Sequence, residues 1–222
     1  MRKFFEFFYL LKGWSTVSYS QEGEDLILRR LLGEKKSGFY VDVGAHHPIR
    51  YSNTYGLYKS GWRGLNIDAM PGSMRLFNII RKKDINLEVP VSSKKSLLTY
   101  YMFNEPALNT FSMDIAERRN GFNGYKLIGE QDILTSRLDE LLLKHNIKED
   151  QIDLLSIDVE GLDLDVLLSL NLELNRPKLI LIEDLPDVKG NEASETEVYL
   201  GRYNYFKVAS TKNTMFFKLN EA

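Results

Sequence analysis

The chain has 222 residues, which is long enough for one domain with a substantial core. Its net charge of −2, with 43% hydrophobic and 27% charged residues, is typical of a globular protein and gives no electrostatic reason to expect nucleic acid as a partner. The absence of cysteine excludes disulfides, thiolate metal ligands and a cysteine nucleophile, and it favours a reducing compartment, for which we expect the cytoplasm.

Residues 1–18 form an aromatic segment in front of a main domain that we place at residues 19–222. The segment begins with the basic residues Arg2 and Lys3. Apolar side chains follow at Phe4, Phe5, Phe7, Phe8, Tyr9, Leu10 and Leu11. This run is too short to span a bilayer, and no cleavage site of small residues follows it. We expect either a helix packed on the domain or on a partner, which we favour, or a peripheral membrane contact.

Residues 20–32 are predicted to form an amphipathic helix with its apolar side chains on one face. Ser20 is the expected N-cap, and Gly33 is expected to end the helix. Polar side chains cluster at its start, at Gln21, Glu24 and Asp25. They can complement the helix dipole or contact a ligand, and the sequence leaves both roles open.

Residues 38–48 read Gly-Phe-Tyr-Val-Asp-Val-Gly-Ala-His-His-Pro, which predicts a buried strand that breaks into a ligand-binding turn. The β-forming run favours a parallel strand covered on both faces. Asp42 interrupts this run, and a buried carboxylate needs a polar partner. Gly44 lets the backbone turn and a ligand approach closely. One glycine turn is weak support for a cofactor, because such turns are common in α/β proteins.

The next strand strengthens this interpretation. A short helix is expected at residues 51–60, and residues 62–68 are predicted to form a strand that ends at Asp68. A carboxylate about 20 residues beyond a glycine turn, at the tip of the neighbouring strand, is placed to accept hydrogen bonds from two ribose hydroxyls. A helix is expected at residues 70–82.

Residues 85–91 are predicted to form a third strand, whose end at Ser92 would lie near an adenine ring if Asp68 holds a ribose. Residues 97–103 alternate weakly and suggest an additional paired strand. Residues 104–131 show no steady periodicity, so we expect an irregular lid or substrate-binding loop there.

Acidic side chains end the remaining buried strands. After a helix at residues 134–145, a strand over residues 152–161 finishes with Asp158, Glu160 and Gly161. Two like charges would then meet at the ligand edge of the sheet unless something positive lies between them. A further strand at residues 177–184 also ends in acids. A helix at residues 195–203 and an antiparallel hairpin of residues 205–210 and 214–219 are expected to complete the chain.

Four motifs together carry a family resemblance. They are Tyr-Ser-Gln-Glu-Gly-Glu-Asp at residues 19–25, Tyr-Val-Asp-Val-Gly-Ala-His-His-Pro at 40–48, Ser-Asn-Thr at 52–54 with Gly-Trp-Arg-Gly-Leu-Asn-Ile-Asp at 61–68, and Ile-Asp-Val-Glu-Gly at 157–161. With these motifs the chain resembles the FkbM-type S-adenosylmethionine-dependent methyltransferases. The resemblance implies a Rossmann-like class I methyltransferase fold of the α/β class, in which a mostly parallel seven-stranded sheet carries a C-terminal antiparallel hairpin.

The resemblance also implies a set of cofactor contacts, with Gly44 beside the methionine part of S-adenosylmethionine and Asp68 on the ribose. The cofactor-binding residues it predicts are Gln21, Asp25, Asp42, Gly44, Ala45, Asn53, Asp68, Ala69, Ser92 and Asp158. The chain departs from the common methyltransferase pattern at His46 and His47, which stand where a further glycine is usual.

By the same resemblance, the methyl acceptor is a hydroxyl on a sugar, a glycan precursor or another small polar metabolite. A hydroxyl acceptor needs a base or a metal to take up its proton. We expect Asp158, His46 or His47 as that base, with Glu160 and Glu183 orienting the acceptor.

A Mg²⁺ site built from Asp158, Glu183 and Asp184 is an open alternative, because oxygen ligands at adjacent strand tips suit this ion. Two other functions also remain open. A nicotinamide-dependent or other nucleotide-cofactor enzyme is disfavoured because the full Gly-x-Gly-x-x-Gly motif is absent, and a non-catalytic binding protein could use the same fold.

Overall fold

The structure is a computed structural model and describes residues 16–148, 150–184 and 193–220. Most of the expected N-terminal aromatic element, residues 1–15, therefore lies outside the described residues. Within the described part of the chain, none of the helices is both long and apolar enough to cross a membrane.

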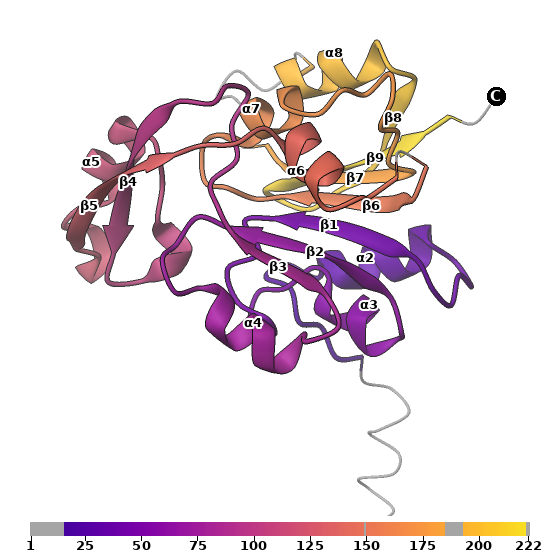
Figure 1. The fold of residues 1–222 in the computed structure, drawn as a ribbon, viewed down its shortest axis with the longest axis horizontal. Coiled ribbons are helices and arrows are strands. Elements are labelled where there is room, and N and C mark those ends of the chain that lie inside the picture. The colour runs from indigo at the N-terminus through magenta and orange to yellow at the C-terminus, as the bar shows by residue number, and fades with distance from the viewer. Residues whose placement is uncertain (1–15, 149, 185–192, 221–222) are drawn as a thin grey trace, which may run out of the picture.

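The fold is built around a seven-stranded sheet with the strand order β3-β2-β1-β6-β7-β9-β8 (Figure 1). Its strands are β1 (Phe39–Val43), β2 (Arg63–Asp68), β3 (Ile85–Glu88), β6 (Ile152–Ile157), β7 (Leu179–Glu183), β8 (Tyr205–Ser210) and β9 (Thr214–Leu219). The first five run parallel, whereas β9 is antiparallel to β7 and to β8. This arrangement confirms the predicted α/β class I methyltransferase fold and its C-terminal hairpin.

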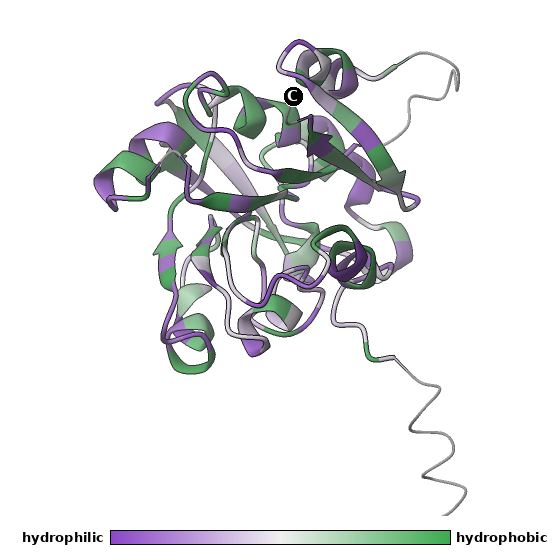
Figure 2. Ribbon diagram, turned by 90° about the vertical axis from the view of Figure 1, so that its right-hand side faces the viewer, coloured by the Kyte–Doolittle hydropathy of each residue, from purple (hydrophilic) through white to green (hydrophobic). Residues whose placement is uncertain are grey.

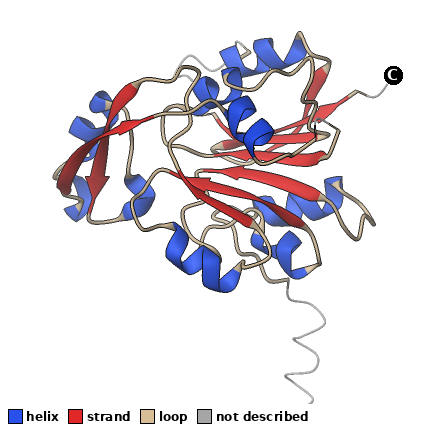
Figure 3. Ribbon diagram, in the orientation of Figure 1, coloured by secondary structure: helices blue, strands red, loops and turns tan. Residues whose placement is uncertain are grey.

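Helices cover both faces of this sheet (Figure 3). They are α2 (Glu24–Leu31), α3 (Tyr55–Lys59), α4 (Met74–Ile80), α6 (Leu138–Lys144), α7 (Asp163–Leu168) and α8 (Glu195–Gly201). The helix α5 (Met113–Arg119) and the short 3-10 turns η1 (Pro106–Leu108) and η2 (Phe122–Gly124) belong to the segment between β3 and β6, and α5 lies beside the strands labelled β4 (Leu97–Phe103) and β5 (Leu127–Leu134) in Figure 1. Figure 2 shows hydrophilic and hydrophobic segments side by side along single helices, as expected for helices with one face on a sheet.

Alternate residues of β1 face two separate cores. Val41 and Val43 pack in a cluster with the leucines of α6 and α7, while Tyr40 packs with Leu28 of α2 and Leu57 of α3. Because both faces are covered, the strand is apolar in the sequence except at Asp42.

The segment between β3 and β6 differs from the expectation. Residues 104–131 were expected to be irregular, but they contain η1, α5, η2 and the first half of β5 (Leu127–Leu134). That strand pairs antiparallel with β4 (Leu97–Phe103) in a small separate sheet, which lies at one end of the central sheet in Figure 1. The following helix consequently begins at Leu138, not at residue 134. The pairing partner of β5 is distant in sequence, so local periodicity did not reveal the strand.

The predicted N-cap of the first helix is also wrong. The helix begins at Glu24 behind Gly23, which adopts a left-handed conformation with φ 89°. The Ser20 hydroxyl instead accepts a hydrogen bond from the Asp25 N–H and donates one to the Asp25 carboxylate. The predicted stop at Gly33 agrees with a helix that ends at Leu31.

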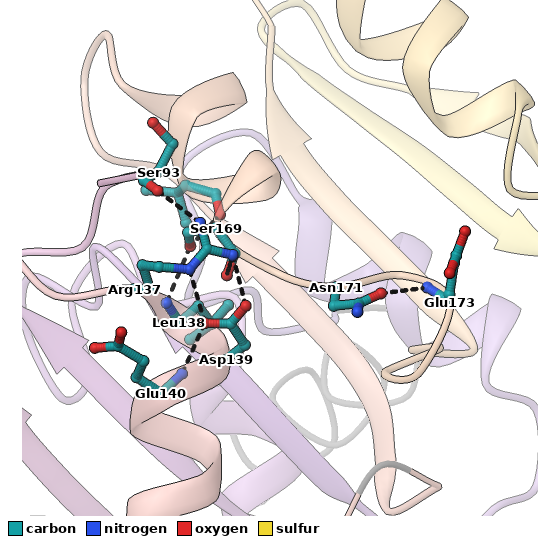
Figure 4. Close-up of polar contacts among 9 residues, drawn as sticks. Ser93, Arg137, Leu138, Asp139, Glu140, Ser169, Asn171 and Glu173 are labelled. Atoms are coloured by element: carbon teal, nitrogen blue, oxygen red, sulfur yellow. Dashed lines mark hydrogen bonds and ion pairs between the residues drawn. The ribbon is translucent and has the colours of Figure 1, made fainter. Parts of the chain in front are cut away.

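Arg137 ties α6 to two neighbouring segments (Figure 4). Its guanidinium donates to the backbone carbonyls of Ser93 and Ser169 and pairs with Asp139 at 2.6 Å. The Ser169 hydroxyl accepts a hydrogen bond from the Leu138 N–H at the start of the helix. These bonds satisfy helix-end groups that would otherwise lack partners.

A fully buried arginine holds the loop that follows β1. The Arg81 guanidinium donates to the Pro48 carbonyl, to Asn66 Oδ1 and to the Thr54 hydroxyl at 2.7 Å. Thr54 in turn donates to Asp42 Oδ2 at 2.5 Å, so the polar partner expected for the buried Asp42 exists. Burial raises the pKa of Asp42, and the Arg81 charge lowers it.

Replacing Arg81 by Met should lower the free energy of unfolding by about 3–5 kcal/mol, because the buried Asp42 carboxylate and several oxygen acceptors would lose their cation. Urea denaturation measures this effect. The control is Arg75→Met, which removes an exposed guanidinium from α4 and should cost less than about 0.5 kcal/mol. Equal losses in the two variants would contradict a structural role for the buried network.

Candidate active site

A cleft opens at the carboxyl edge of the central sheet, where β1, β2 and β6 end. Seven of the residues predicted to act in catalysis or cofactor binding line it: Gln21, Gly44, His46, Asp68, Ala69, Asp158 and Glu160. The register explains why they meet, because Val43 pairs with Ile67 of β2 on one side and with Ile157 of β6 on the other. The residues that follow these three strands must therefore emerge together.

Gly44 is required by the packing of two strand ends. Its φ is +83°, and a Cβ added there would lie 1.7 Å from the carbonyl oxygen of Asp158. The Gly44 N–H donates to the Ile67 carbonyl at 2.9 Å. The sequence suggested that the glycine makes room for a ligand, but the space of a side chain is filled by backbone of the same protein.

Asp68 lies at the end of β2 with each carboxylate oxygen bonded to a backbone N–H. Oδ2 accepts from His46 and Oδ1 accepts from Met70, both at 2.8 Å. Burial raises the pKa of Asp68, and these two bonds act in the opposite direction. A carboxylate oxygen can accept more than one hydrogen bond, so both oxygens can still receive a ligand hydroxyl.

His46 presents a polar atom without a partner. Its Nε2 is buried and has no hydrogen bond to any described residue. The residue adopts a left-handed conformation with φ 51°, and burial lowers its pKa, which favours the neutral ring. A buried ring nitrogen without a protein partner is normally paired with a water molecule, an ion or a ligand.

Three carboxylates converge beside the cleft. Asp158, Glu160 and Glu183 offer oxygens that all lie within 4.8 Å of one another. Burial raises the pKa of Asp158 well above its ordinary value, and the charges of Glu183 and Glu160 raise it further. Burial and the nearby Glu160 and Asp163 raise the pKa of Glu183 to about 8. Bound protons or a nearby cation must therefore neutralise part of the negative charge of these three carboxylates.

Asp163 in α7 holds the turn on which two of these acids sit. Its carboxylate accepts from the N–H groups of Val159 at 2.9 Å and Gly161 at 3.0 Å. Glu160 lies between them in a left-handed conformation with φ 57°. Burial raises the pKa of Asp163 to about 6, and the two backbone bonds favour its charged form.

The segment between β3 and β6, which we call the inserted segment, supplies a cation for the three carboxylates. Arg119 of α5 pairs with Glu160 at 2.5 Å and also donates to the Leu108 carbonyl at 2.9 Å. The Thr110 hydroxyl donates to the Glu160 carbonyl at 2.6 Å. Sequence analysis missed Arg119, although the acids at residues 158 and 160 indicated that something positive should lie near them.

The same insertion forms one wall of the cleft. The wall is contributed by Tyr100, Pro106, Ala107, Asn109 and Phe111. The segment expected to be a loop near the substrate is thus a folded unit over the cleft. The sequence could not show which of its residues line the cleft, because the pairing of β4 with β5 sets their positions.

Several predicted cofactor residues lie outside the cleft lining. Asp25 accepts hydrogen bonds from the Ser18 hydroxyl and the Tyr19 N–H, so its carboxylate secures the chain before α2. Asn53 donates to the Ser156 hydroxyl at 3.3 Å. Asp42 faces the Arg81 network described above. The cofactor contacts predicted for these side chains remain predictions.

Three more predicted site residues are also placed away from the cleft lining. The Ser92 side chain is buried, and its hydroxyl donates to Asp165 at 2.5 Å. Ala45 packs in a small buried cluster with two side chains of α4. His47 Nδ1 accepts from the Arg50 N–H at 2.9 Å, which makes it part of the turn.

The acids proposed for a metal site are also arranged differently from the expectation. The sequence grouped Asp158 and Glu183 with Asp184, whereas Glu160 is the third carboxylate that approaches them in the structure. Asp184 Oδ2 is buried without a hydrogen bond to any residue that the structure describes.

Comparison with protein families finds one match, to the methyltransferase FkbM domain, over residues 42–207. The matched region begins near the end of β1 and contains the cleft residues from Gly44 to Glu160 and the entire segment between β3 and β6. Curated proteins and solved structures give no match.

Replacing Glu183 by Gln should reduce the pH dependence of stability. The pKa of Glu183 is raised from 4.5 to about 8, so between these values the folded state holds a proton that the unfolded state has released. This carboxylate therefore makes the protein less stable as the pH rises through that window. At pH 8 the variant should be more stable than the wild type by about 3–5 kcal/mol, because each unit of pKa difference corresponds to about 1.4 kcal/mol.

Urea denaturation at both ends of the window gives the measurement. The exposed Glu117 offers a matched control, since Glu117→Gln removes one carboxylate elsewhere on the surface. If Glu183→Gln and Glu117→Gln changed the pH dependence of the free energy of unfolding equally, the raised pKa of Glu183 would be contradicted.

Proposed function

We propose, from the premise that this chain belongs to the FkbM family of methyltransferases, that it transfers a methyl group from S-adenosylmethionine to a hydroxyl of a sugar, a glycan precursor or another small polar metabolite. One observation carries the proposal: a single cleft contains Gly44, Asp68 and Asp158 at the ends of three adjacent strands. Ligands of open α/β sheets bind at this edge.

The residues of the cleft fit the parts of S-adenosylmethionine. Asp68 can accept hydrogen bonds from the two ribose hydroxyls while keeping its bonds to the backbone. Val89, Pro90 and Val91 provide an apolar surface for the adenine ring. We assign the amino acid end of the cofactor to the region of Gln21 and Gly44, and the unpartnered His46 Nε2 supports a polar ligand group nearby.

The cofactor, when bound, supplies a methyl group on a sulfonium, which the acceptor oxygen displaces in line. The protein must hold the acceptor in line with that methyl group and remove the hydroxyl proton, and alignment alone can contribute several kcal/mol. We assign proton removal to the ionised form of Asp158, which lines the cleft and whose raised pKa makes its carboxylate a stronger base than that of an ordinary aspartate. Glu160 and Glu183 would orient the acceptor.

His46 is the alternative base, since it lines the cleft and its lowered pKa keeps the ring neutral. His47 is a weaker candidate because its Nδ1 already accepts two backbone N–H groups. A Mg²⁺ ion would fit the oxygens of Asp158, Glu160 and Glu183, although Arg119 already balances one of these charges.

We further propose that residues 19–222 act as one methyltransferase domain and that the protein works in the cytoplasm. The single central sheet runs through this region from β1 to β9, which supports the first proposal. The absence of cysteine supports a reducing compartment.

Replacing Asp68 by Ala should weaken S-adenosylhomocysteine binding by about 10-fold to 100-fold, because hydrogen bonds to a charged group contribute about 1.5–3 kcal/mol each. Calorimetric titration measures the affinity, with NAD as a second ligand and with Mg²⁺ present or absent. Glu88→Ala is the matched control, since Glu88 pairs with Asp68 across the sheet and lies outside the cleft.

Unchanged affinity in Asp68→Ala would refute the ribose assignment. Binding of NAD in place of S-adenosylhomocysteine by the wild type would favour the oxidoreductase alternative, and binding of neither would refute the cofactor proposal.

Replacing Asp158 by Asn should lower turnover by about 100-fold or more and change S-adenosylhomocysteine affinity by less than about threefold, because a general base acts on the acceptor and not on the cofactor. Release of S-adenosylhomocysteine is followed over a panel of monosaccharides and nucleotide sugars, with Glu88→Gln as the control. Full turnover in Asp158→Asn would refute its role as base. Cofactor binding by the wild type without turnover across the panel would favour a non-catalytic binding protein.

A further inference from the structure

The charges of the central sheet are separated between its two edges. Acids end or follow β2, β6 and β7 at the carboxyl edge, whereas basic residues precede or begin each parallel strand at the opposite, amino-terminal edge. The basic residues are Lys35 and Lys36 before β1, Arg63 at the start of β2, Lys82 and Lys83 before β3, Lys148 before β6, and Arg176 and Lys178 before β7. Parallel strands start at one edge, so these side chains gather there although they are far apart in sequence.

Arg29 and Arg30 in the last turn of α2, together with Lys218 of β9, extend this surface. We call these eleven residues the basic edge. Among the described residues, the acids nearby do not balance it: Asp153 is shared by Lys35 at 2.5 Å and Lys178 at 3.0 Å, Asp84 accepts from Gly64 and Asn66, and the exposed acids are Glu34, Asp150 and Glu173. The basic edge is therefore positive on a protein whose net charge is −2.

Apolar side chains accompany the charges. Lys35 borders two hollows, one lined by Thr16, Ile27 and Trp62 and the other by Lys178, Phe206 and Lys218. Phe206 is 49% exposed and Val17 is 64% exposed. Because Thr16 lines the first hollow, the aromatic segment that precedes it in the chain joins the domain at the basic edge.

We propose that the basic edge docks on the surface of an anionic lipid bilayer, with the exposed Phe206 and Val17 at the headgroup region. Basic residues attract anionic headgroups, and aromatic side chains favour the interface between water and hydrocarbon. A nucleic acid would also attract the lysines, but it gives no role to the exposed aliphatic Val17. The inference goes beyond the proposed methyl transfer and does not depend on it.

This orientation has a consequence for access to the cleft. The cleft lies at the carboxyl ends of the parallel strands, so docking through their amino-terminal ends directs it away from the bilayer. A bound protein would receive its small ligands from the aqueous side.

Sedimentation of the full chain with vesicles tests the proposal. We expect binding to phosphatidylcholine vesicles that contain phosphatidylglycerol, weak binding to pure phosphatidylcholine, and loss of the difference at high salt. The test variant replaces Arg29, Arg30, Lys36 and Lys218 by Gln, because Lys35 and Lys178 also hold Asp153. Each basic residue near an anionic surface strengthens binding by about fivefold, so the variant with four substitutions should bind about 600-fold more weakly.

The control removes the same charge from residues away from the basic edge. It replaces the exposed Lys94, Lys95, Arg118 and Lys126 by Gln and should change binding by less than about threefold. Equal losses in the two variants, or equal binding to both kinds of vesicle, would overturn the proposal. So would double-stranded RNA that displaced the protein from the anionic vesicles.

A third variant examines the apolar part of the surface in the full chain. Replacing Phe206 and Val17 by Ser should weaken binding to anionic vesicles even at high salt. Unchanged vesicle binding would overturn the apolar part of the proposal.

Discussion

The close approach of the Asp158 carbonyl oxygen to Gly44 is the constraint on which the cleft depends. A Cβ at this position would lie 1.7 Å from that oxygen, so the ends of β1 and β6 can meet only through a residue without a side chain. The same turn directs the His46 N–H to Asp68 at the end of β2. The backbone thereby holds three strand ends together and sets the spacing of the polar groups around the cleft.

The second constraint is electrostatic. Asp158, Glu160 and Glu183 cannot all ionise at such short separation without a balancing charge, and burial increases the cost. The repulsion is reduced because the pKa values of Asp158 and Glu183 are raised, which favours their protonated forms, and because Arg119 pairs with Glu160. Since Arg119 belongs to the insertion between β3 and β6, the insertion completes the site both as a wall and as a source of positive charge. In its ionised form, a carboxylate with a raised pKa is also a stronger base for the removal of a hydroxyl proton.

The same parallel topology explains why two surfaces of opposite charge coexist on a nearly neutral chain. Residues after the strands meet at one edge, and residues before them meet at the other. An excess of acids in the first set and of basic residues in the second therefore gives each edge its charge. The acidic edge forms the cleft, and the basic edge lies beside the point where the aromatic segment joins the domain. Ligand binding and docking can thus occupy opposite ends of one sheet without sharing residues.

The sequence by itself determined the α/β class, the central strands, the C-terminal hairpin and the acids at the strand ends. These features follow from local patterns, since a strand buried on both faces must be apolar and its polar residues can only follow its end. The tertiary structure alone decided the pairing of β4 with β5, the approach of Arg119 to Glu160, and the orientation of Asp25, Asn53 and Ser92 away from the cleft lining. In each case the deciding partner lies elsewhere in the fold, and the direction of a side chain is set by that partner and not by its neighbours in the chain.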